Sequence, residues 1–180
     1  MPIRAVLAGA RVLIPSLEDS KRLWEEGFYG KPLGEPKPRG PIDKPLVLDL
    51  VEAVYLAKRG VIEVYRGGER LDAAGLEEEA RRLIPRFDYL YRVYEELRDA
   101  GYVVRSGLKF GADYAVYEHG PGIDHAPFLV SVVDYDESID PLEIVKAGRL
   151  SHSVRKHFVI AAVDRRSLRV TYLAFSWTRV

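Results

Sequence analysis

The sequence predicts a mixed α/β (α+β) fold in two domains: a small N-terminal α/β domain at residues 1–85 and a domain with a mixed sheet at residues 86–180. Along the 180 residues, short strand-like runs are interleaved with segments whose apolar residues recur at helical spacing. Hydrophobic residues make up 47% of the chain, which is enough for a core. Pro85 separates two of the helical patterns and is the predicted domain boundary.

The N-terminal domain begins with two predicted strands within residues 3–14, around Gly9. A helix is expected from Ser16, a suitable N-cap residue, to about Gly27. Residues 46–59 have apolar side chains at helical spacing and are predicted to form a second helix. The remaining predicted elements are a strand at 61–65, a turn at 67–68 and a charged amphipathic helix at 76–84.

Residues 27–45 form a long loop in this interpretation. Their density of glycine and proline excludes a helix or a central strand. The loop is long for a connection inside a compact domain, which favours a functional role. Its charged residues are Lys31, Lys37, Arg39 and Lys44, against Glu35 and Asp43. Two interpretations remain open, a solvated insertion and a basic finger that contacts a phosphate backbone.

The second domain is predicted to start with a helix at 86–100, with Pro85 at its first position and an apolar stripe that faces the core. Alternation at 113–118 places Tyr117 on one face of a strand, and a loop rich in glycine and proline follows at 119–125. Asp140 is expected to cap a helix that ends near residue 150. The other predicted strands lie at 102–105, 127–133, 156–163 and 168–175.

The composition excludes several classes of protein. Cysteine is absent, so neither disulfides nor thiolate metal sites can form. The chain shows no apolar run of about 18 residues and no signal-peptide pattern, so we expect a soluble, cytoplasmic protein without a membrane partner. Asparagine and glutamine are absent and arginine outnumbers lysine, a composition typical of hyperthermophiles.

The formal net charge is zero, from 27 basic and 27 acidic residues, whereas nucleic-acid proteins usually carry a basic excess. The charges are unevenly distributed, because residues 144–163 contain no acid. The basic residues of this segment are Lys146, Arg149, Arg155 and Lys156. Either a solvated helix surface or a local basic face explains this cluster.

Three residues between positions 105 and 158 suit cleavage of a phosphodiester by its own 2′-hydroxyl. Tyr117 is a base candidate, His125 in the loop is an acid candidate, and Lys156 is a cation for charge on a pentacoordinate phosphorane. Each has an ordinary alternative, namely a packing tyrosine, a structural histidine and a charged strand start. The order and spacing of the three residues carry more information than any one of them.

Metal and nucleotide chemistry are not supported by the sequence. The four histidines lack a supported HxxxH spacing, so we expect no metal and no cofactor. The acid-x-lysine pairs of a metal-dependent nuclease occur only at residues 19–21 and 35–37, inside a helix and inside the proline-rich loop. Phosphate-binding glycine motifs are absent as well.

Residues 102–180 resemble the catalytic domain of the archaeal tRNA-splicing endonucleases (tRNA-intron endonucleases). The matching segments are GLKFGADYAVY at 107–117, His125 with PFLV at 127–130, Gly148 with Arg149, and Tyr172 with Trp177. The first half of the chain fits the small N-terminal domain of that family more loosely. The resemblance implies a restriction-endonuclease-like core in the C-terminal catalytic domain.

The resemblance further implies metal-independent cleavage of precursor tRNA at bulge–helix–bulge exon–intron junctions, which leaves a 2′,3′-cyclic phosphate and a 5′-hydroxyl. Tyr117 would deprotonate the 2′-hydroxyl, His125 would protonate the departing 5′-oxygen, and Lys156 would hold the transition-state charge. A tyrosine with a pKa of about 10 is a poor base at neutral pH. Lys156 or nearby arginines must therefore lower that pKa, or Tyr117 mainly orients the hydroxyl.

RNA and subunit contacts also follow from the resemblance. Arg149 and Trp177 occupy the places of two flat groups that clamp a bulged base. Lys44 is the expected RNA contact of the basic loop for a different reason, namely that it leads directly into the next predicted helix and is therefore the best anchored of the loop cations. Asp164 is the expected acidic residue at a subunit interface. The loop and the composition favour the crenarchaeal type, an α2β2 heterotetramer with a structural subunit, with a homotetramer as the alternative.

Two rival functions remain open. The first is a non-catalytic structural subunit of the same complex, which should lack the Tyr117, His125 and Lys156 set. The second is a metal-dependent DNA nuclease or resolvase on a similar core. Other bulge–helix–bulge RNAs are possible additional substrates of the favoured endonuclease.

Overall fold

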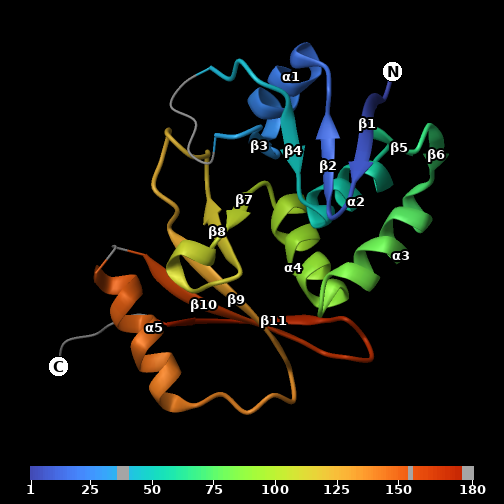
Figure 1. Ribbon diagram of the computed structural model, residues 1–180. Helices are drawn as coiled ribbons and strands as arrows, with labels where there is room; N and C mark the ends of the chain where they lie inside the picture. Colours follow the sequence, from blue (N-terminus) through green and yellow to red (C-terminus); the bar gives the residue numbers. More distant parts are fainter. Residues whose placement is uncertain (36–40, 154–155, 176–180) are drawn as a thin grey trace. The chain divides into compact units, whose positions relative to one another are not determined.

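A computed structural model describes residues 1–35, 41–153 and 156–175; for residues 150–153 it describes the backbone only. The chain divides into two compact units, Met1–Phe87 and Asp88–Val180 (Figure 1). Each unit contains one sheet with helices, so the predicted mixed α/β fold class is confirmed. Within the described ranges, no helix has the length and apolar character needed to cross a membrane.

The first unit is built on a six-stranded sheet with the order β3-β4-β2-β1-β5-β6. The central β1 pairs with β2 in antiparallel and with β5 in parallel orientation. The strands are β1 (Ile3–Ala8), β2 (Arg11–Ile14), β3 (Lys31–Pro32), β4 (Leu46–Leu48), β5 (Ile62–Arg66) and β6 (Glu69–Leu71). The helices are α1 (Leu17–Gly27), α2 (Leu50–Lys58) and α3 (Ala73–Leu83).

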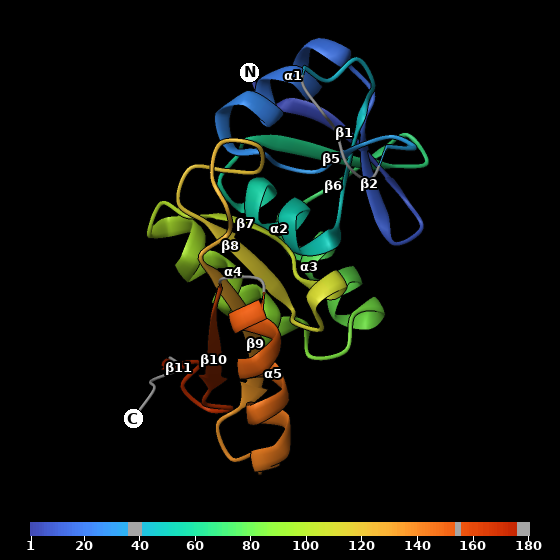
Figure 2. The same ribbon diagram turned by 90° about the vertical axis from the view of Figure 1, so that its left-hand side faces the viewer.

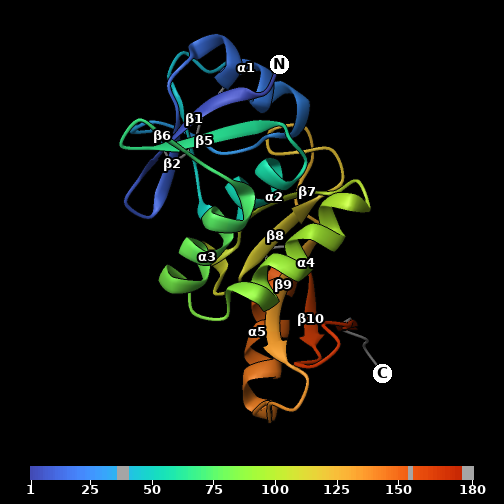
Figure 3. The same ribbon diagram turned by 90° about the vertical axis from the view of Figure 1, so that its right-hand side faces the viewer.

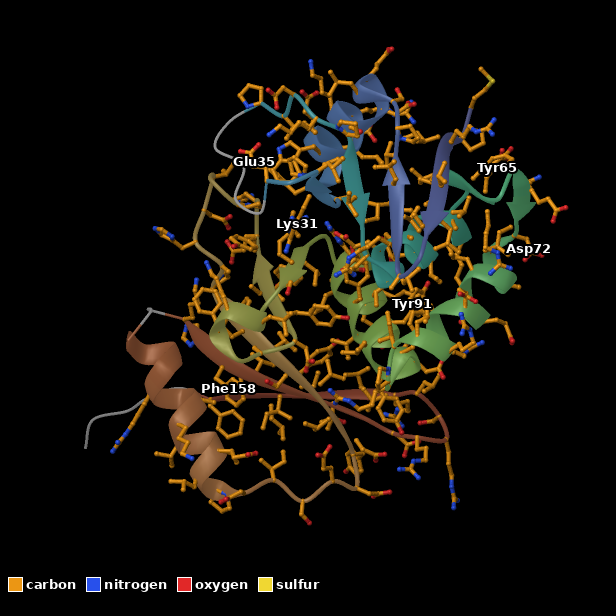
Figure 4. All side chains as sticks on the ribbon, in the orientation of Figure 1. Lys31, Glu35, Tyr65, Asp72, Tyr91 and Phe158 are labelled. Carbon is orange, nitrogen blue, oxygen red and sulfur yellow. The ribbon has the colours of Figure 1, made fainter. Side chains whose placement is uncertain are left out.

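Each helix of this unit begins at a side chain that accepts a main-chain hydrogen bond. Ser16 accepts from the N–H of Asp19 before α1, and Asp72 accepts from the N–H of Gly75 before α3, where Figure 4 labels it. Asp49 and Glu52 form a reciprocal capping box at the start of α2. Such caps satisfy N–H groups that the helix itself leaves without partners.

Two details of the sequence prediction for this region are wrong. Leu46–Leu48 form strand β4 rather than the first turn of a helix, because they pair with β2 and bury Leu46 and Leu48 completely. Pro85 does not lie in the first turn of a helix. Instead, Arg86 has a φ of 59°, the N–H of Phe87 bonds to Ile84 O, and α4 starts only at Phe87.

The second unit contains a five-stranded sheet with the order β11-β10-β9-β8-β7. The pair β9–β10 is parallel and the other neighbours are antiparallel. The strands are β7 (Val103–Ser106), β8 (Tyr114–Tyr117), β9 (Phe128–Asp134), β10 (His157–Val163) and β11 (Val170–Phe175). The helices are α4 (Phe87–Asp99), α5 (Pro141–Ser153) and the short 3-10 helix η1 (Leu108–Phe110).

The helices α4 and α5 cover opposite faces of this sheet. Figure 2 shows α5 in front of the strands, whereas Figure 3 shows α4 in front of them. On the α4 face, the hydroxyl of Tyr114 donates to the carbonyl of Leu90, and the Tyr114 ring lies 6.0 Å from that of Tyr94. On the α5 face, Phe158 of β10 lines a pocket together with residues of α5 (Figure 4). The second unit is therefore a helix–sheet–helix layer structure.

Candidate active site

The ends of three strands meet at one edge of the second sheet. Tyr117 is the last residue of β8, and Phe128 and His157 are the first residues of β9 and β10. Phe128 pairs with Val116 on one side and with His157 on the other. This strand register brings the segments that carry Tyr117, His125 and Lys156 to the same edge.

Tyr117 is half-buried against a small apolar cluster on the α5 face of the sheet. The cluster consists of Ala112, Ala115, Ala126 and Leu129, with Phe110 packed against it beside the tyrosine. Because Ala126 directly follows His125 in the chain, the packing of Tyr117 also fixes its place relative to the histidine loop. Ring packing of this kind gives the phenol a defined position.

The electrostatic surroundings of Tyr117 favour its neutral form. Burial raises its pKa above the ordinary value of 10.0, Arg105 acts in the opposite direction, and the charge of Asp124 raises it again. Arg105 pairs with Ala115 across β7 and β8, so it is a diagonal neighbour of Tyr117 on the same face. Of the two alternatives for Tyr117, a pKa lowered by neighbouring cations is not favoured, because burial outweighs the effect of Arg105. The alternative, a hydroxyl that orients the substrate, remains.

His125 is exposed at the end of a loop that a single carboxylate closes. The two oxygens of Asp124 accept hydrogen bonds from three successive main-chain N–H groups. The donors are Glu118 (3.0 Å), His119 (3.1 Å) and Gly120 (2.8 Å). Gly120 and Gly122 have φ values of 133° and 89°, which favour glycine at both positions.

Lys156 is half-buried, and its Nζ donates a hydrogen bond of 2.7 Å to the carbonyl oxygen of Ala126. The same Nζ lies 5.5 Å from the centroid of the Phe110 ring, and Nζ of Lys109 lies 4.5 Å from it. Burial lowers the pKa of Lys156, the charge of Lys109 lowers it further, and Asp124 acts in the opposite direction. Two ammonium groups thus face one aromatic ring.

The structure brings Tyr117, His125 and Lys156 together around Ala126. Tyr117 packs against the cluster that contains Ala126, His125 precedes it, and Lys156 donates to its carbonyl. A phenol, an exposed imidazole and an anchored ammonium at one sheet edge form a set suited to proton transfer and to stabilising an anionic phosphorane. Within the part of the chain that the structure describes, no cluster of His, Asp and Glu could hold a metal ion.

Comparison with known proteins places this arrangement in a family. Residues 87–172 match the tRNA intron endonuclease catalytic C-terminal domain, and residues 3–77 match the tRNA intron endonuclease N-terminal domain. The chain belongs to the tRNA intron endonuclease family. Together the two matched regions cover most of the chain and include Tyr117, His125 and Lys156.

Curated relatives are similar in sequence to this chain over nearly its full length. A tRNA-splicing endonuclease of Hyperthermus butylicus is 54% identical over 179 residues, which cover 98% of this chain and 99% of the relative. A tRNA-splicing endonuclease of Saccharolobus islandicus is 50% identical over 181 residues, covering 99% of this chain and all of the relative. The corresponding Saccharolobus solfataricus protein is 48% identical over the same span. These organisms are crenarchaea, so the predicted kinship with crenarchaeal splicing endonucleases is confirmed.

The other residues predicted from the family resemblance lie elsewhere. Arg149 is exposed on the C-terminal half of α5, and its predicted partner Trp177 lies outside the described residues. Asp164 follows β10 and lies at the opposite end of that strand from Lys156, roughly 26 Å away at the usual rise per residue. Its Oδ1 accepts from the N–H groups of Arg166 and Ser167 and from the Ser167 hydroxyl. Asp164 therefore caps its own turn.

Lys44 lies in the first unit and is exposed. Its Nζ forms an ion pair of 3.7 Å with Oε2 of Glu35, which Figure 4 labels in the same loop. Exposed pairs of this length contribute little to stability, so the ammonium is available to a stronger anion. Of the other loop cations, Lys31 is the exposed first residue of β3, whereas Lys37 and Arg39 fall within 36–40 and lie outside the described residues.

Both ends of the loop at 27–45 are anchored by buried polar side chains. Oε1 of Glu52 accepts from the N–H of Gly30, and the hydroxyl of Ser20 accepts from the N–H of Leu46. Glu52 is 7% exposed and Ser20 is completely buried. The loop also contributes the short edge strand β3, which pairs with β4. The ends of the loop thus belong to the fold of the unit.

Sequence reasoning missed Asp124 and Lys109. Lys109 belongs to the GLKFG segment that supported the family resemblance, but nothing in its spacing shows that it faces the ring approached by Lys156. Asp124 had an identifiable signal. An aspartate at the end of a short glycine- and proline-rich turn such as Gly-Pro-Gly-Ile-Asp is a typical residue to accept main-chain hydrogen bonds within that turn.

Proposed function

We propose that this chain is the catalytic subunit of a tRNA-splicing endonuclease that cuts precursor tRNA at bulge–helix–bulge junctions. The cut leaves a 2′,3′-cyclic phosphate and a 5′-hydroxyl. The observation that carries the proposal is the convergence of Tyr117, His125 and Lys156 around Ala126 in a chain of this family. Other RNAs with the same bulged motif are candidate substrates as well.

In the proposed reaction, one P–O bond forms, one P–O bond breaks, and two protons are transferred. The 2′-oxygen attacks the phosphorus, the bond to the 5′-oxygen breaks, and His125 gives a proton to that oxygen. Tyr117, held neutral because burial raises its pKa, accepts a hydrogen bond from the 2′-hydroxyl and orients it. The hydroxyl proton leaves to water. Lys156, fixed by its bond to Ala126 O, stabilises the additional negative charge of the phosphorane.

RNA recognition uses flat and basic groups around the cleavage chemistry. We assign Arg149 and Trp177 to a clamp that stacks on a bulged base, because splayed bases are recognised by such flat side chains. Lys44 is assigned to a phosphate contact. This role suits a loop whose two ends are held at Gly30 and Leu46. Because the ends of the loop are already fixed, less conformational entropy is lost when the loop binds RNA.

Assembly is proposed to involve the edge strand β11 of the second sheet and the turn that precedes it. The edge strand β11 exposes Tyr172 and Leu173, which are 40% and 49% exposed. Unpaired edges with apolar side chains are typical sites for pairing with another chain. We propose an α2β2 heterotetramer with a structural subunit, with a homotetramer as the alternative, and assign the Asp164 turn to a subunit contact. We also propose that the boundary between the two domains in the sequence lies between residues 85 and 86.

A cleavage assay with a bulge–helix–bulge RNA in EDTA tests these proposals. The chain is assayed alone and with a candidate structural subunit, and the product ends are mapped. Cyclic phosphate ends that form only with the partner would support both the chemistry and the two-subunit assembly. Cleavage by the chain alone would support the chemistry and the homotetramer. Activity that requires Mg²⁺ would instead favour the metal-dependent nuclease, and inactivity in every condition would favour the non-catalytic subunit.

A further inference from the structure

We propose that Asp124 is a positioning residue for RNA cleavage, because its carboxylate fixes the loop that joins Tyr117 to His125. The inference rests on the proposed function, since it concerns how the same site is held in shape. Asp124 would not contact the RNA or transfer a proton. It would set the position from which the imidazole of His125 reaches the departing 5′-oxygen.

The carboxylate connects two chain segments at the points where they carry the reactive side chains. The carboxylate accepts hydrogen bonds from the N–H groups of the three residues directly after Tyr117, and Asp124 itself directly precedes His125. The base of the loop is therefore closed by hydrogen bonds of 2.8–3.1 Å to an ionised group. Such charge-assisted bonds are stronger than bonds between neutral groups. The spacing between the phenol and the imidazole follows from this closure.

Little else in the described structure holds this loop. Ile123 is its large apolar residue, yet 67% of that side chain is exposed, so hydrophobic burial does not fix the tip. Gly120 and Gly122 give the backbone wide freedom in the absence of restraints. The carbonyl of Gly120 also accepts from the N–H groups of Ile123 and Asp124, which closes the loop at Gly120. Among the described residues, the Asp124 carboxylate extends this closure to the N–H groups of Glu118 and His119, the two residues directly after β8.

The charge of Asp124 gives the proposal a second readout. Burial opposes ionisation, but the bonds from Gly120, His119 and Glu118 lower the pKa of Asp124, so the group is negative at neutral pH. That charge raises the pKa of both Tyr117 and Lys156.

Other charged groups also act on these two residues. Arg105 of β7 acts on Tyr117, Lys109 of η1 acts on Lys156, and His119 acts on Asp124 itself. A variant that removes only the charge of Asp124 therefore changes a defined part of this network.

The test compares D124A and D124N with the wild type and with D72N as a matched control. Asp72 also accepts a main-chain N–H, from Gly75 at 2.8 Å, but it caps α3 in the first unit. We expect D124A to cut bulge–helix–bulge RNA about 100-fold more slowly in single turnover, the scale expected when a catalytic group is misplaced by about 1 Å. The RNA Kd should stay within about twofold of wild type. D124N keeps one acceptor oxygen, so its cleavage rate should lie between the rates of wild type and D124A. D72N should cut at the wild-type rate.

Two further measurements separate positioning from loss of the fold. Amide hydrogen exchange at residues 118–120 should become faster in D124A, while the amides of β9 and β10 keep their protection. In D124N the alkaline limb of the cleavage rate should move to lower pH, because loss of the negative charge lowers the pKa of Lys156. A purely structural defect would reduce the rate at every pH without moving this limb.

Specific results would overturn the inference. They are wild-type cleavage by D124A, a loss explained by RNA Kd alone, unchanged exchange at 118–120, or an unmoved alkaline limb in D124N. A wild-type chain that cuts no RNA either alone or with the structural subunit, while exchange at 118–120 still increases in D124A, would overturn the proposed function itself. In that case Asp124 would only fasten the loop and would have no positioning role.

Discussion

The ammonium of Lys156 donates a hydrogen bond of 2.7 Å to the carbonyl oxygen of Ala126, the residue that follows His125. This bond joins the start of β10 to the start of β9, the parallel neighbour that enters the sheet at the same edge. The lysine thus has a fixed direction before any substrate binds. A preorganised cation of this kind stabilises developing charge without reorganisation during the reaction.

Replacement of Lys156 by alanine should reduce single-turnover cleavage by about 100- to 1,000-fold, a range typical for removal of one electrostatic contact to a transition state. Ground-state RNA affinity should change much less. Lys58, which pairs with Glu77 at 2.8 Å in the first unit, provides the matched control K58Q. Equal losses in the two variants would contradict a specific role for Lys156.

Replacement of Lys109 by glutamine should move the alkaline limb of the cleavage rate to higher pH. The charge of Lys109 lowers the pKa of Lys156, so its removal allows Lys156 to remain protonated at higher pH. The shift has the opposite sign to that expected for D124N. Rates measured across the alkaline range, corrected for uncatalysed RNA cleavage, check both signs. A shift in the same direction for both variants would contradict this account of the site.

Two substitutions separate the contribution of the Tyr117 ring to packing from the contribution of its hydroxyl to cleavage. Y117F keeps the ring against the apolar cluster, so its unfolding temperature should match wild type while its cleavage rate falls. Y117A also removes the packing. Since the ring is half-buried, we expect Y117A to lose about 1–2 kcal/mol of unfolding free energy, less than the 3–5 kcal/mol typical of buried aromatics. Wild-type cleavage by Y117F would exclude a role for the hydroxyl.

Lys44 and Glu35 form a matched pair for testing the basic loop. K44A should weaken RNA binding and reduce its salt dependence by about one phosphate contact. E35A removes the ion-pair partner but keeps the cation, so it should bind RNA at least as tightly as wild type. Neither change should alter the unfolding temperature measurably, because the pair is exposed. An unchanged salt dependence of RNA binding in K44A would favour the other interpretation of the loop, a solvated insertion.

Asp134 should make the second unit sensitive to acid. Bonds from the N–H of Asp136, from Arg165 and from Tyr89 lower its pKa, in that order of importance. A lowered folded-state pKa gives stability that is present above the unfolded value of about 3.9 and is lost as pH falls through the folded value. D134N should therefore unfold at a lower temperature than wild type at pH 7, and the difference should shrink towards pH 2. A constant difference would contradict this linkage.

The sequence predicted most of the fold because its local signals agree with its tertiary contacts. The helices begin close to capping residues such as Ser16 and Asp140, and the hairpin turn falls at Gly67 and Gly68 as expected. The error at Leu46–Leu48 arose because three apolar residues before a helix fit either state. Only the pairing with β2, a contact distant in sequence, decides for a strand.

The candidate site was predictable in its residue types but not in its supports. Tyr117, His125 and Lys156 were found from a family pattern, and their catalytic roles remain predictions. The direction of the pKa of Tyr117 could not be read from the sequence, because it depends on burial against Ala112, Ala115 and Leu129. Such burial is a tertiary property, and it here exceeds the effect of the neighbouring arginine.

The meeting of Tyr117, Phe128 and His157 at one sheet edge also constrains how the protein can vary in length. The turn after β9, at residues 135–139, leaves the opposite edge, and its Tyr135 is 58% exposed. Residues inserted there would lengthen the crossover without changing the spacing of the three proposed catalytic side chains. A single residue added between His125 and Phe128 would instead displace the imidazole from the strand that anchors it. A change of length at residues 135–139 therefore leaves the spacing of Tyr117, His125 and Lys156 unchanged, whereas a change between His125 and Phe128 does not.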